Sequence, residues 1–246
     1  MTASPTSPVR TVGVLGNANH MILRLTLQKL LAAGTVPTFV LEDLGSPAMV
    51  RKTGWYQECW EKTTPVDTEP FPTVAEMLAP HPGVAHYTVD DCNSEEACAL
   101  MSRHTSELFL LANTRVVKPY IRGSLPFLFA ILDNAPLGIT LHHVLPALDA
   151  GDMLSTCSIP IKRGDTVADM IRSAAIATAE LMLQGVVDWD GTTNGVKQDE
   201  SMLLERNRKC HLAPRTKELF SEFCAKADAF LESRQYRWYD RAVTPE

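Results

Sequence analysis

Short apolar runs and helical repeats alternate along the chain from its start. Residues Val9 to Leu15 form an apolar run that leads into Gly16-Asn17-Ala18-Asn19, and leucines then repeat at helical spacing until Gly34. Thr38 to Leu41 is a second apolar run, which ends at Glu42-Asp43. This order predicts a strand, a tight turn, a helix and a second strand. An acidic pair after a buried strand is typical of the ligand-facing edge of a parallel sheet.

The alternation resumes after an irregular stretch from Gly45 to Pro82, where Trp55, Tyr56 and Trp60 form either a small satellite core or a stacking surface. The elements predicted beyond it are, in order, a strand at Val84–Val89, a helix at Asn93–His104 with Asn93 and Glu96 as N-cap and reciprocal glutamate, a strand at Leu108–Ala112, a helix at Leu125–Leu132, strands at Ile139–Val144 and Thr156–Ile161, a helix from Asp165 to near Gly185, and a C-terminal amphipathic helix through Leu219–Leu231.

Strands that alternate with helices predict an α/β fold. We expect a Rossmann-like, mostly parallel sheet of about six or seven strands, with helices on both faces and the long helix from Asp165 packed on one of them. The ligand site is expected at the carboxyl edge of the strands. The chain divides into a flexible tail (1–8), an α/β domain (9–187) and a C-terminal helical extension (188–246).

Composition narrows the classes of partner. The chain has 246 residues, of which 45% are hydrophobic and 21% charged, which is enough for one substantial core. A net charge of −6 disfavours binding to phosphate backbones. The six cysteines form no CxxC pair and indicate reduced thiols and no metal site. Charged residues interrupt the apolar runs, and no secretion signal is apparent, so we expect a cytoplasmic protein without a membrane span.

Candidate chemistry lies in the stretch from Gly138 to Leu154. A predicted strand delivers His142 and His143, and Asp149 follows on a turn that contains Gly151. One loop could bring a carboxylate and an imidazole together, which is an arrangement used for proton transfer. The alternative is a buried strand histidine that only packs, with an aspartate that caps the turn.

This stretch resembles the folate-binding loop of the formyltransferases that act on glycinamide ribonucleotide, methionyl-tRNA and amino sugars. His142, Asp149 and Gly151 match that loop in type and spacing. The resemblance implies that Asp149 orients a catalytic histidine and positions a water that assists proton movement. It also implies that the surrounding loop, including Leu148 and Gly151, covers the pterin of the co-substrate 10-formyltetrahydrofolate.

Two more segments carry the resemblance, which extends from Val12 to Val187 and rests mainly on residues 106 to 154. Ser106–Pro119 resembles the strand and turn whose backbone reads the pterin edge, which implies cofactor contacts for Arg115 and Val117. A solvated loop cation is the alternative for Arg115. Arg122-Gly123 resembles the family's Tyr-Arg-Gly turn and is expected to contact substrate.

The family's Asn-x-His-Pro signature has no counterpart in the chain. Pro119 is followed only by Tyr120 and Ile121 before Arg122-Gly123. In the family the Asn polarises the formyl carbonyl and the His handles the proton, so loss of both bears directly on catalysis. Three explanations stay open: the sequence omits a segment, the protein has become a silent binder, or other residues such as His143 and Asp152 have taken over.

The resemblance implies an amine on a small metabolite as acceptor, such as an amino sugar or a nucleotide-linked amine. Gly16, Asn17 and Asn19 open the first predicted helix, where they either hold a phosphate on backbone amides or form a helix cap. A catalytically silent relative that binds folate or a sugar nucleotide is the second reading. A hydrolase that releases formate is the third, and a homodimer is left open.

Methionyl-tRNA is not the expected acceptor. Only 59 residues follow Val187, too few for the family's tRNA-binding β-barrel and its linker, and the densest basic stretch, Arg206 to Lys209, has three charges. No nucleic-acid partner is therefore expected.

Overall fold

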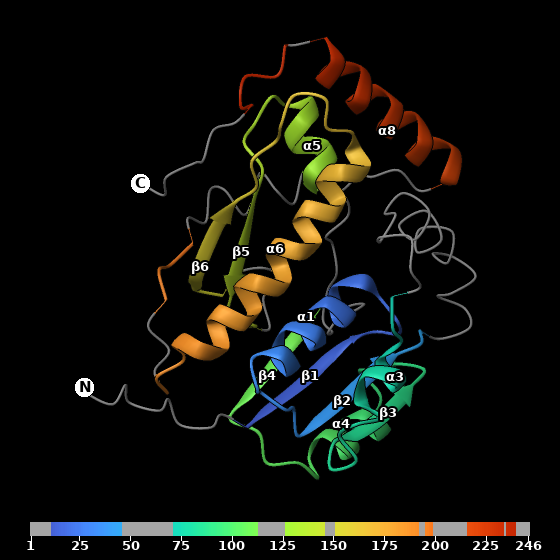
Figure 1. Ribbon diagram of the computed structural model, residues 1–246, viewed down its shortest axis with the longest axis vertical. Coiled ribbons are helices and arrows are strands. Elements are labelled where there is room, and N and C mark those ends of the chain that lie inside the picture. The colour runs from blue at the N-terminus through green and yellow to red at the C-terminus, as the bar shows by residue number, and fades with distance from the viewer. Residues whose placement is uncertain are drawn as a thin grey trace.

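The computed structural model describes residues 11–45, 71–112, 126–145, 151–191, 195–198, 216–233 and 235–239. Its elements follow one another as β1 (Val12–Asn17), α1 (Met21–Ala32), β2 (Phe39–Asp43), α3 (Val74–Leu78), β3 (Ala85–Val89), α4 (Glu95–Met101), β4 (Leu108–Ala112), α5 (Pro126–Leu132), β5 (Gly138–His142), β6 (Met153–Ser158), α6 (Val167–Asp188) and α8 (Lys217–Glu232) (Figure 1).

The first four strands form a parallel sheet in the order β3-β2-β1-β4. Its central strands read as continuous apolar runs because both of their faces are covered. Leu23, Leu27 and Leu30 of α1 are fully buried against one face, as their helical spacing predicts. On the other face Ala97 of α4 packs against the apolar residues of β2 and β3. The predicted α/β fold with a parallel, Rossmann-like sheet is therefore confirmed.

The prediction of six or seven strands in one mainly parallel sheet is wrong for the described part of the chain. Four strands are parallel, while β5 and β6 form a separate antiparallel pair. Ten residues, 143 to 152, separate these two strands, and a parallel pair needs a crossover of roughly a dozen residues or more. Among the described residues no strand pairs with the outer edge of β4.

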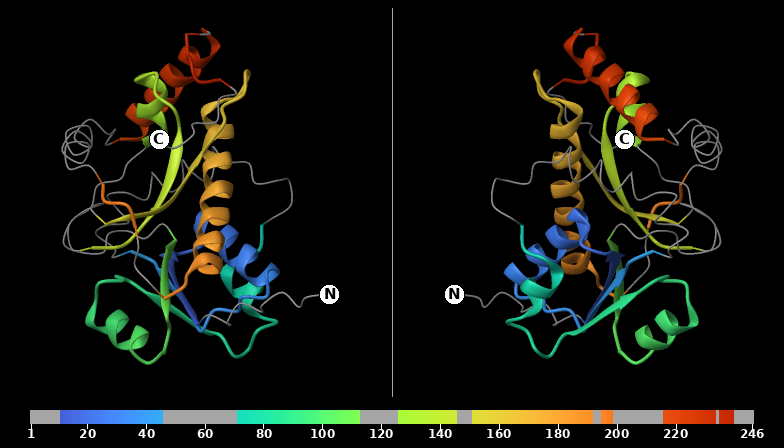
Figure 2. Two further views of the ribbon diagram at one scale, coloured as in Figure 1. Left: turned by 90° about the vertical axis from the view of Figure 1, so that its left-hand side faces the viewer. Right: turned by 90° about the vertical axis from the view of Figure 1, so that its right-hand side faces the viewer.

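Helix α6 joins the two sheets. It packs against α1 on one side and against β5 and β6 on the other, and Figure 2 shows it running along the hairpin and down to α1. The helix is long and apolar enough to cross a bilayer, but its Met170 and Ile171 are buried in one core of the protein and its Met182 and Val186 in another. This helix therefore serves as a core element of the fold.

The long helix extends past its predicted end at Gly185 and stops at Asp188. Gly185 lies inside it because Leu141 of β5 packs directly over this position: a β-carbon here would lie 2.4 Å from Cδ2 of Leu141. The glycine thus allows close packing and does not end the helix. At α4 the predicted N-cap Asn93 is also wrong, since Ser94 caps the helix and accepts a hydrogen bond from the Ala97 amide.

The start of α6 is fixed by a capping box. Thr166 accepts a hydrogen bond from the amide of Asp169, and the Asp169 carboxylate accepts one from the amide of Thr166. The bonds that Thr166 donates through its hydroxyl and its amide lower the pKa of Asp169 from its ordinary 3.8.

Replacing Thr166 with alanine is expected to lower the free energy of unfolding by about 1 kcal/mol at neutral pH. A carboxylate with a lowered pKa stabilises the fold above its unfolded pKa, and this stabilisation is lost as the pH falls through the folded value. The difference in free energy of unfolding between Thr166→Ala and the native chain should therefore become smaller below about pH 4. Urea unfolding at pH 7 and pH 3 measures it, and an undiminished difference at pH 3 would contradict the role of Asp169.

The C-terminal segment packs onto α5 and α6. Phe220, Ala227 and Leu231 of α8 are buried in one core with Leu128 of α5 and Ile171 of α6. The Asp228 carboxylate accepts a hydrogen bond from the Val167 amide at the start of α6, at 2.7 Å.

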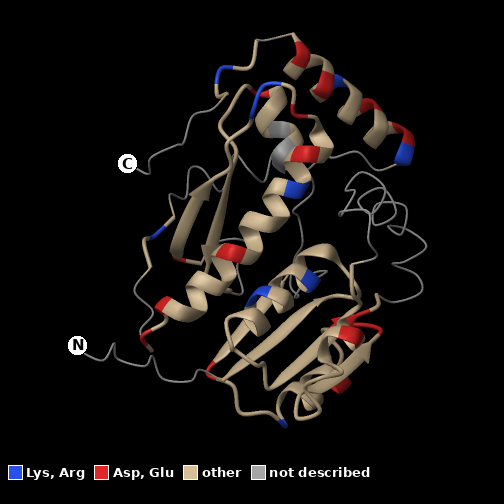
Figure 3. Ribbon diagram, in the orientation of Figure 1, with Lys and Arg blue, Asp and Glu red and all other residues tan. Residues whose placement is uncertain are grey.

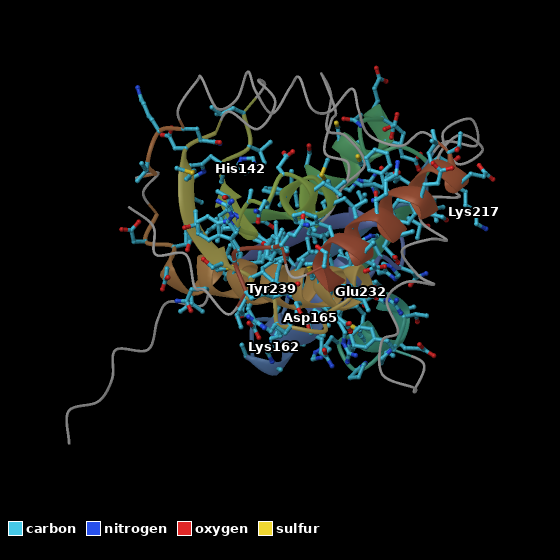
Figure 4. The ribbon with its side chains drawn as sticks, turned by 90° about the horizontal axis from the view of Figure 1, so that it is seen from above. His142, Lys162, Asp165, Lys217, Glu232 and Tyr239 are labelled. Atoms are coloured by element: carbon cyan, nitrogen blue, oxygen red, sulfur yellow. The ribbon has the colours of Figure 1, made fainter. Side chains whose placement is uncertain are left out.

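Residues 235–239 then return to the domain. Trp238 donates from its indole to the Asn134 carbonyl, and Tyr239 pairs with Ile161. Figure 4 shows Tyr239 close to Lys162 and Asp165, which lie in the turn that precedes α6.

Candidate functional site

The hairpin of β5 and β6 holds three of the predicted site residues. His142 is the last residue of β5, His143 follows it, and Gly151 lies just before β6. The His143 amide donates to the Asp152 carbonyl at 3.0 Å, which closes the base of the intervening loop. A β-carbon at position 151 would lie 1.7 Å from the His143 carbonyl oxygen, so only glycine fits this crossing point. The structure therefore brings His142, His143 and Gly151 together.

The two histidines differ in their contacts. His142 Nδ1 lies 2.8 Å from the His143 carbonyl oxygen, which can only accept, so Nδ1 carries the proton in this contact. The His143 ring meets Trp189 edge-on at 6.2 Å between ring centroids. Its Nε2 is buried and makes no hydrogen bond with any residue that the structure describes. A buried imidazole nitrogen without a partner is costly, and such groups often mark a place where a ligand binds.

A short segment at 195–198 supports this hairpin from outside. Val196 and Met153 exchange two backbone hydrogen bonds of 2.8 Å, and Gln198 Nε2 donates to the Gly151 carbonyl at 2.6 Å. Gln198 is not among the residues predicted from the sequence. No local pattern marks it, because its partner lies 47 positions earlier in the chain.

Gly16, Asn17 and Asn19 are brought together by the turn between β1 and α1. A β-carbon on Gly16 would lie 2.6 Å from the Ala112 carbonyl oxygen of β4, so glycine permits the close approach of the two strands. Asn17 ends β1, and its buried side-chain oxygen has no hydrogen-bond partner in the described part of the chain. Asn19 adopts a left-handed conformation with φ of 51°. His20, which is 8% exposed, caps α1 by accepting from the Ile22 amide at 3.2 Å.

Glu42, at the carboxyl end of β2, holds this turn in place. The residue is 4% exposed. Its Oε2 accepts from the Asn19 amide at 2.6 Å, and its Oε1 lies 2.7 Å from Nε2 of His86 on β3. The acidic ending of β2 is apparent in the sequence, whereas its contacts with the turn and with His86 are not.

Asp43 adds a second buried carboxylate beside Glu42. The Asp43 carboxylate accepts from the Gly45 amide, and its backbone carbonyl accepts from the Ala18 amide at 2.9 Å. Burial, and then the charge and hydrogen bond of Asp43, raise the pKa of the Cys92 thiol to about 12. Cys92 is therefore no nucleophile at neutral pH. Figure 3 shows acidic residues gathered near this end of β2 and β3.

Several predicted site residues lie outside the described part of the chain. These are Arg115, Val117, Arg122, Gly123, Leu148 and Asp149, together with the Trp55, Tyr56 and Trp60 cluster. Within the described ranges no group of three or more His, Cys, Asp or Glu residues could hold a metal ion.

Sequence relatives match part of the chain. A methionyl-tRNA formyltransferase from Streptococcus equi subsp. equi is 35% identical over 85 residues, which are 34% of this chain and 27% of that protein. One from Methylobacillus flagellatus is 36% identical over 88 residues, 35% of this chain and 29% of that protein. The chain thus matches less than a third of each relative's length. No model of a protein family matches the chain.

Solved structures match more of the chain at lower identity. A formyltetrahydrofolate deformylase from Pseudomonas putida KT2440 superposes with a TM-score of 0.51 at 12% identity, over 79% of this chain and 72% of that one. A likeness at this identity shows the fold alone. Together with the 3-2-1-4 order of the parallel strands, it shows that the chain has a formyltransferase-like α/β fold, and about a third of the chain is also similar in sequence to methionyl-tRNA formyltransferases.

Proposed function

We propose that this chain transfers a formyl group from 10-formyltetrahydrofolate to an amine of a small metabolite, such as an amino sugar or a nucleotide-linked amine. One observation carries the proposal. The β5–β6 hairpin closes where Gly151 lies against the backbone of His143, the residue after His142, within the segment that resembles the folate-binding loop. In the same hairpin, Nε2 of His143 is buried and has no hydrogen-bond partner among the described residues. A polar atom on the edge of the pterin could form a hydrogen bond with it.

The reaction requires an amine to attack the formyl carbon and to lose a proton, while the folate nitrogen leaves with one. 10-Formyltetrahydrofolate supplies the formyl carbon when bound. Because His142 carries its proton on Nδ1 in the contact with the His143 carbonyl, it can accept the amine's proton only at Nε2. Asp149 orients this histidine, while Leu148, Gly151, Arg115 and Val117 hold the pterin. Gly16, Asn17, Asn19, Arg122 and Gly123 contact the acceptor.

The second candidate is a silent relative that binds folate or a sugar nucleotide and transfers nothing. The absence of Asn-x-His-Pro favours it, because loss of one oxyanion donor typically lowers the rate by roughly a hundredfold to a thousandfold. Such a protein would keep its folate affinity. A hydrolase that releases formate, with water in place of the amine, is the third candidate.

His142→Gln is expected to lower kcat for formyl transfer by about a hundredfold or more, because glutamine cannot take up a proton. The dissociation constant for folate should change much less, since glutamine keeps a donor for the His143 carbonyl. His81→Gln, in the loop before β3, serves as the control and should leave both values unchanged. Equal losses of kcat in the two variants would remove His142 from the mechanism.

The decisive test of the proposed function begins with the transcript across Pro119 to Gly123. A recovered Asn-x-His-Pro segment would decide for the enzyme. If the junction is authentic, a panel of amino sugars and nucleotide-linked amines is assayed with 10-formyltetrahydrofolate, and formylated product is followed by mass spectrometry. Folate binding without product would identify the silent relative, and release of formate would identify the hydrolase.

A further inference from the structure

The backbone amides of the first turn are already used within the protein. Ala18 donates to the Asp43 carbonyl, Asn19 to the Glu42 carboxylate, and His20 to the Asn17 carbonyl. The Ile22 amide donates to the His20 ring. A phosphate at a helix N-terminus is held by such amides. Four of the backbone amides that could hold a phosphate at this turn therefore already donate hydrogen bonds to other groups of the protein.

The charge of the turn also opposes an anion. Glu42 Oε2 lies 2.6 Å from the Asn19 amide, at the positively polarised start of α1, and therefore occupies a position that suits a bound anion. Asp43 places a second buried carboxylate next to it on the chain. The other carboxylate oxygen of Glu42, Oε1, pairs with the His86 ring.

The remaining unsatisfied group of the turn is an acceptor. The side-chain oxygen of Asn17, with the amide oriented as the structure has it, is buried and has no hydrogen-bond partner among the described residues. A hydroxyl or an amine could donate to it, whereas a phosphate dianion could not.

We infer that Glu42 excludes phosphate from the turn between β1 and α1, and that the acceptor presents a hydroxyl- or amine-bearing part to this turn. Glu42 is thus a specificity-determining residue. The inference rests on the proposed function only in assuming that an amine acceptor exists. The exclusion of phosphate itself can be measured without any turnover.

The test is an NMR titration of the intact, 15N-labelled chain with inorganic phosphate at constant ionic strength. The native chain should show no saturable shifts at the amides of residues 18–23. Glu42→Gln removes the charge and keeps the shape of the side chain, and it should raise phosphate affinity at these amides at least about tenfold. Glu42→Ala, which also releases the Asn19 amide, should raise it further.

Glu96→Gln removes one exposed carboxylate at the start of α4 and serves as the matched control, with no gain expected. Saturable phosphate binding to this turn in the native chain would overturn the inference, and so would a folded Glu42→Gln protein without any gain. Should Glu42→Ala not fold, the Glu42→Gln result decides alone. Failure of formyl transfer would leave these outcomes unchanged, so the inference and the proposed function fail separately.

Discussion

Replacing Gly151 with alanine should weaken folate binding by at least about a hundredfold. The added β-carbon would lie 1.7 Å from the His143 carbonyl oxygen, which is backbone and cannot move without opening the base of the hairpin. A misplacement of about 1 Å in an active site can cost roughly a hundredfold in rate, and we expect a loss of the same order in folate affinity. Calorimetric titration with folinic acid, the stable 5-formyl isomer, measures the effect.

Gly83→Ala is the matched control, because a β-carbon at position 83 meets nothing within 4 Å. It should bind folinic acid as the native chain does. Both variants should retain far-ultraviolet circular dichroism typical of the parallel sheet, which lies outside the hairpin. If Gly151→Ala binds with native affinity, the hairpin is not the folate site.

Phe220→Ala should lower the free energy of unfolding by about 3–5 kcal/mol, more than Thr166→Ala or Leu219→Ala. Phe220 is 2% exposed and is among the largest fully buried side chains in the core formed by α5, α6 and α8. Its removal leaves a cavity at the centre of the contact between the C-terminal helix and the rest of the protein. Urea denaturation at neutral pH measures the change.

Leu219→Ala, one position earlier in α8, should change stability by less than about 1 kcal/mol, because this leucine is 42% exposed. The pair separates core packing from helix propensity, since both variants gain alanine in the same turn. Equal effects of the two substitutions would show that α8 does not pack through the face that contains Phe220.

The first half of the parallel sheet could be predicted from the sequence because its signals are local. The apolar run to Leu15, the glycine at position 16 and the leucine repeat in α1 each fix one element, and neighbouring elements agree. The ending of β2 in Glu42-Asp43 was also correctly placed at the edge where parallel strands end. Here the local pattern determines both the element and its position in the sheet.

The arrangement of the second half depended on distant contacts. The sequence does not show that β5 and β6 stand apart from the parallel sheet, because strand pairing is decided by which edges meet in space. A glycine such as Gly185 is typical of a helix end, but here its lack of a side chain leaves room for Leu141 of β5. Asn and Ser are both favoured at the N-cap position, and in the structure Ser94 occupies it in place of Asn93.

Within the candidate site, residue types could be predicted better than contacts. His142 and Gly151 were identified because they match the folate-binding loop in type and spacing, and the structure places Gly151 against the backbone of His143, which follows His142. The hydrogen bonds from the Asn19 amide to Glu42 and from Gln198 to the Gly151 carbonyl join residues 23 and 47 positions apart. Neither pair forms a sequence motif, so only the folded chain reveals them.

We expect the chain to bind a reduced folate at the β5–β6 hairpin. Calorimetric titration of the native chain with folinic acid tests it most directly, with circular dichroism melting to establish that the protein is folded. We expect a single saturable site with one folate per chain, and its loss in Gly151→Ala but not in Gly83→Ala. A cooperatively melting native chain that shows no saturable binding of folinic acid would contradict the account.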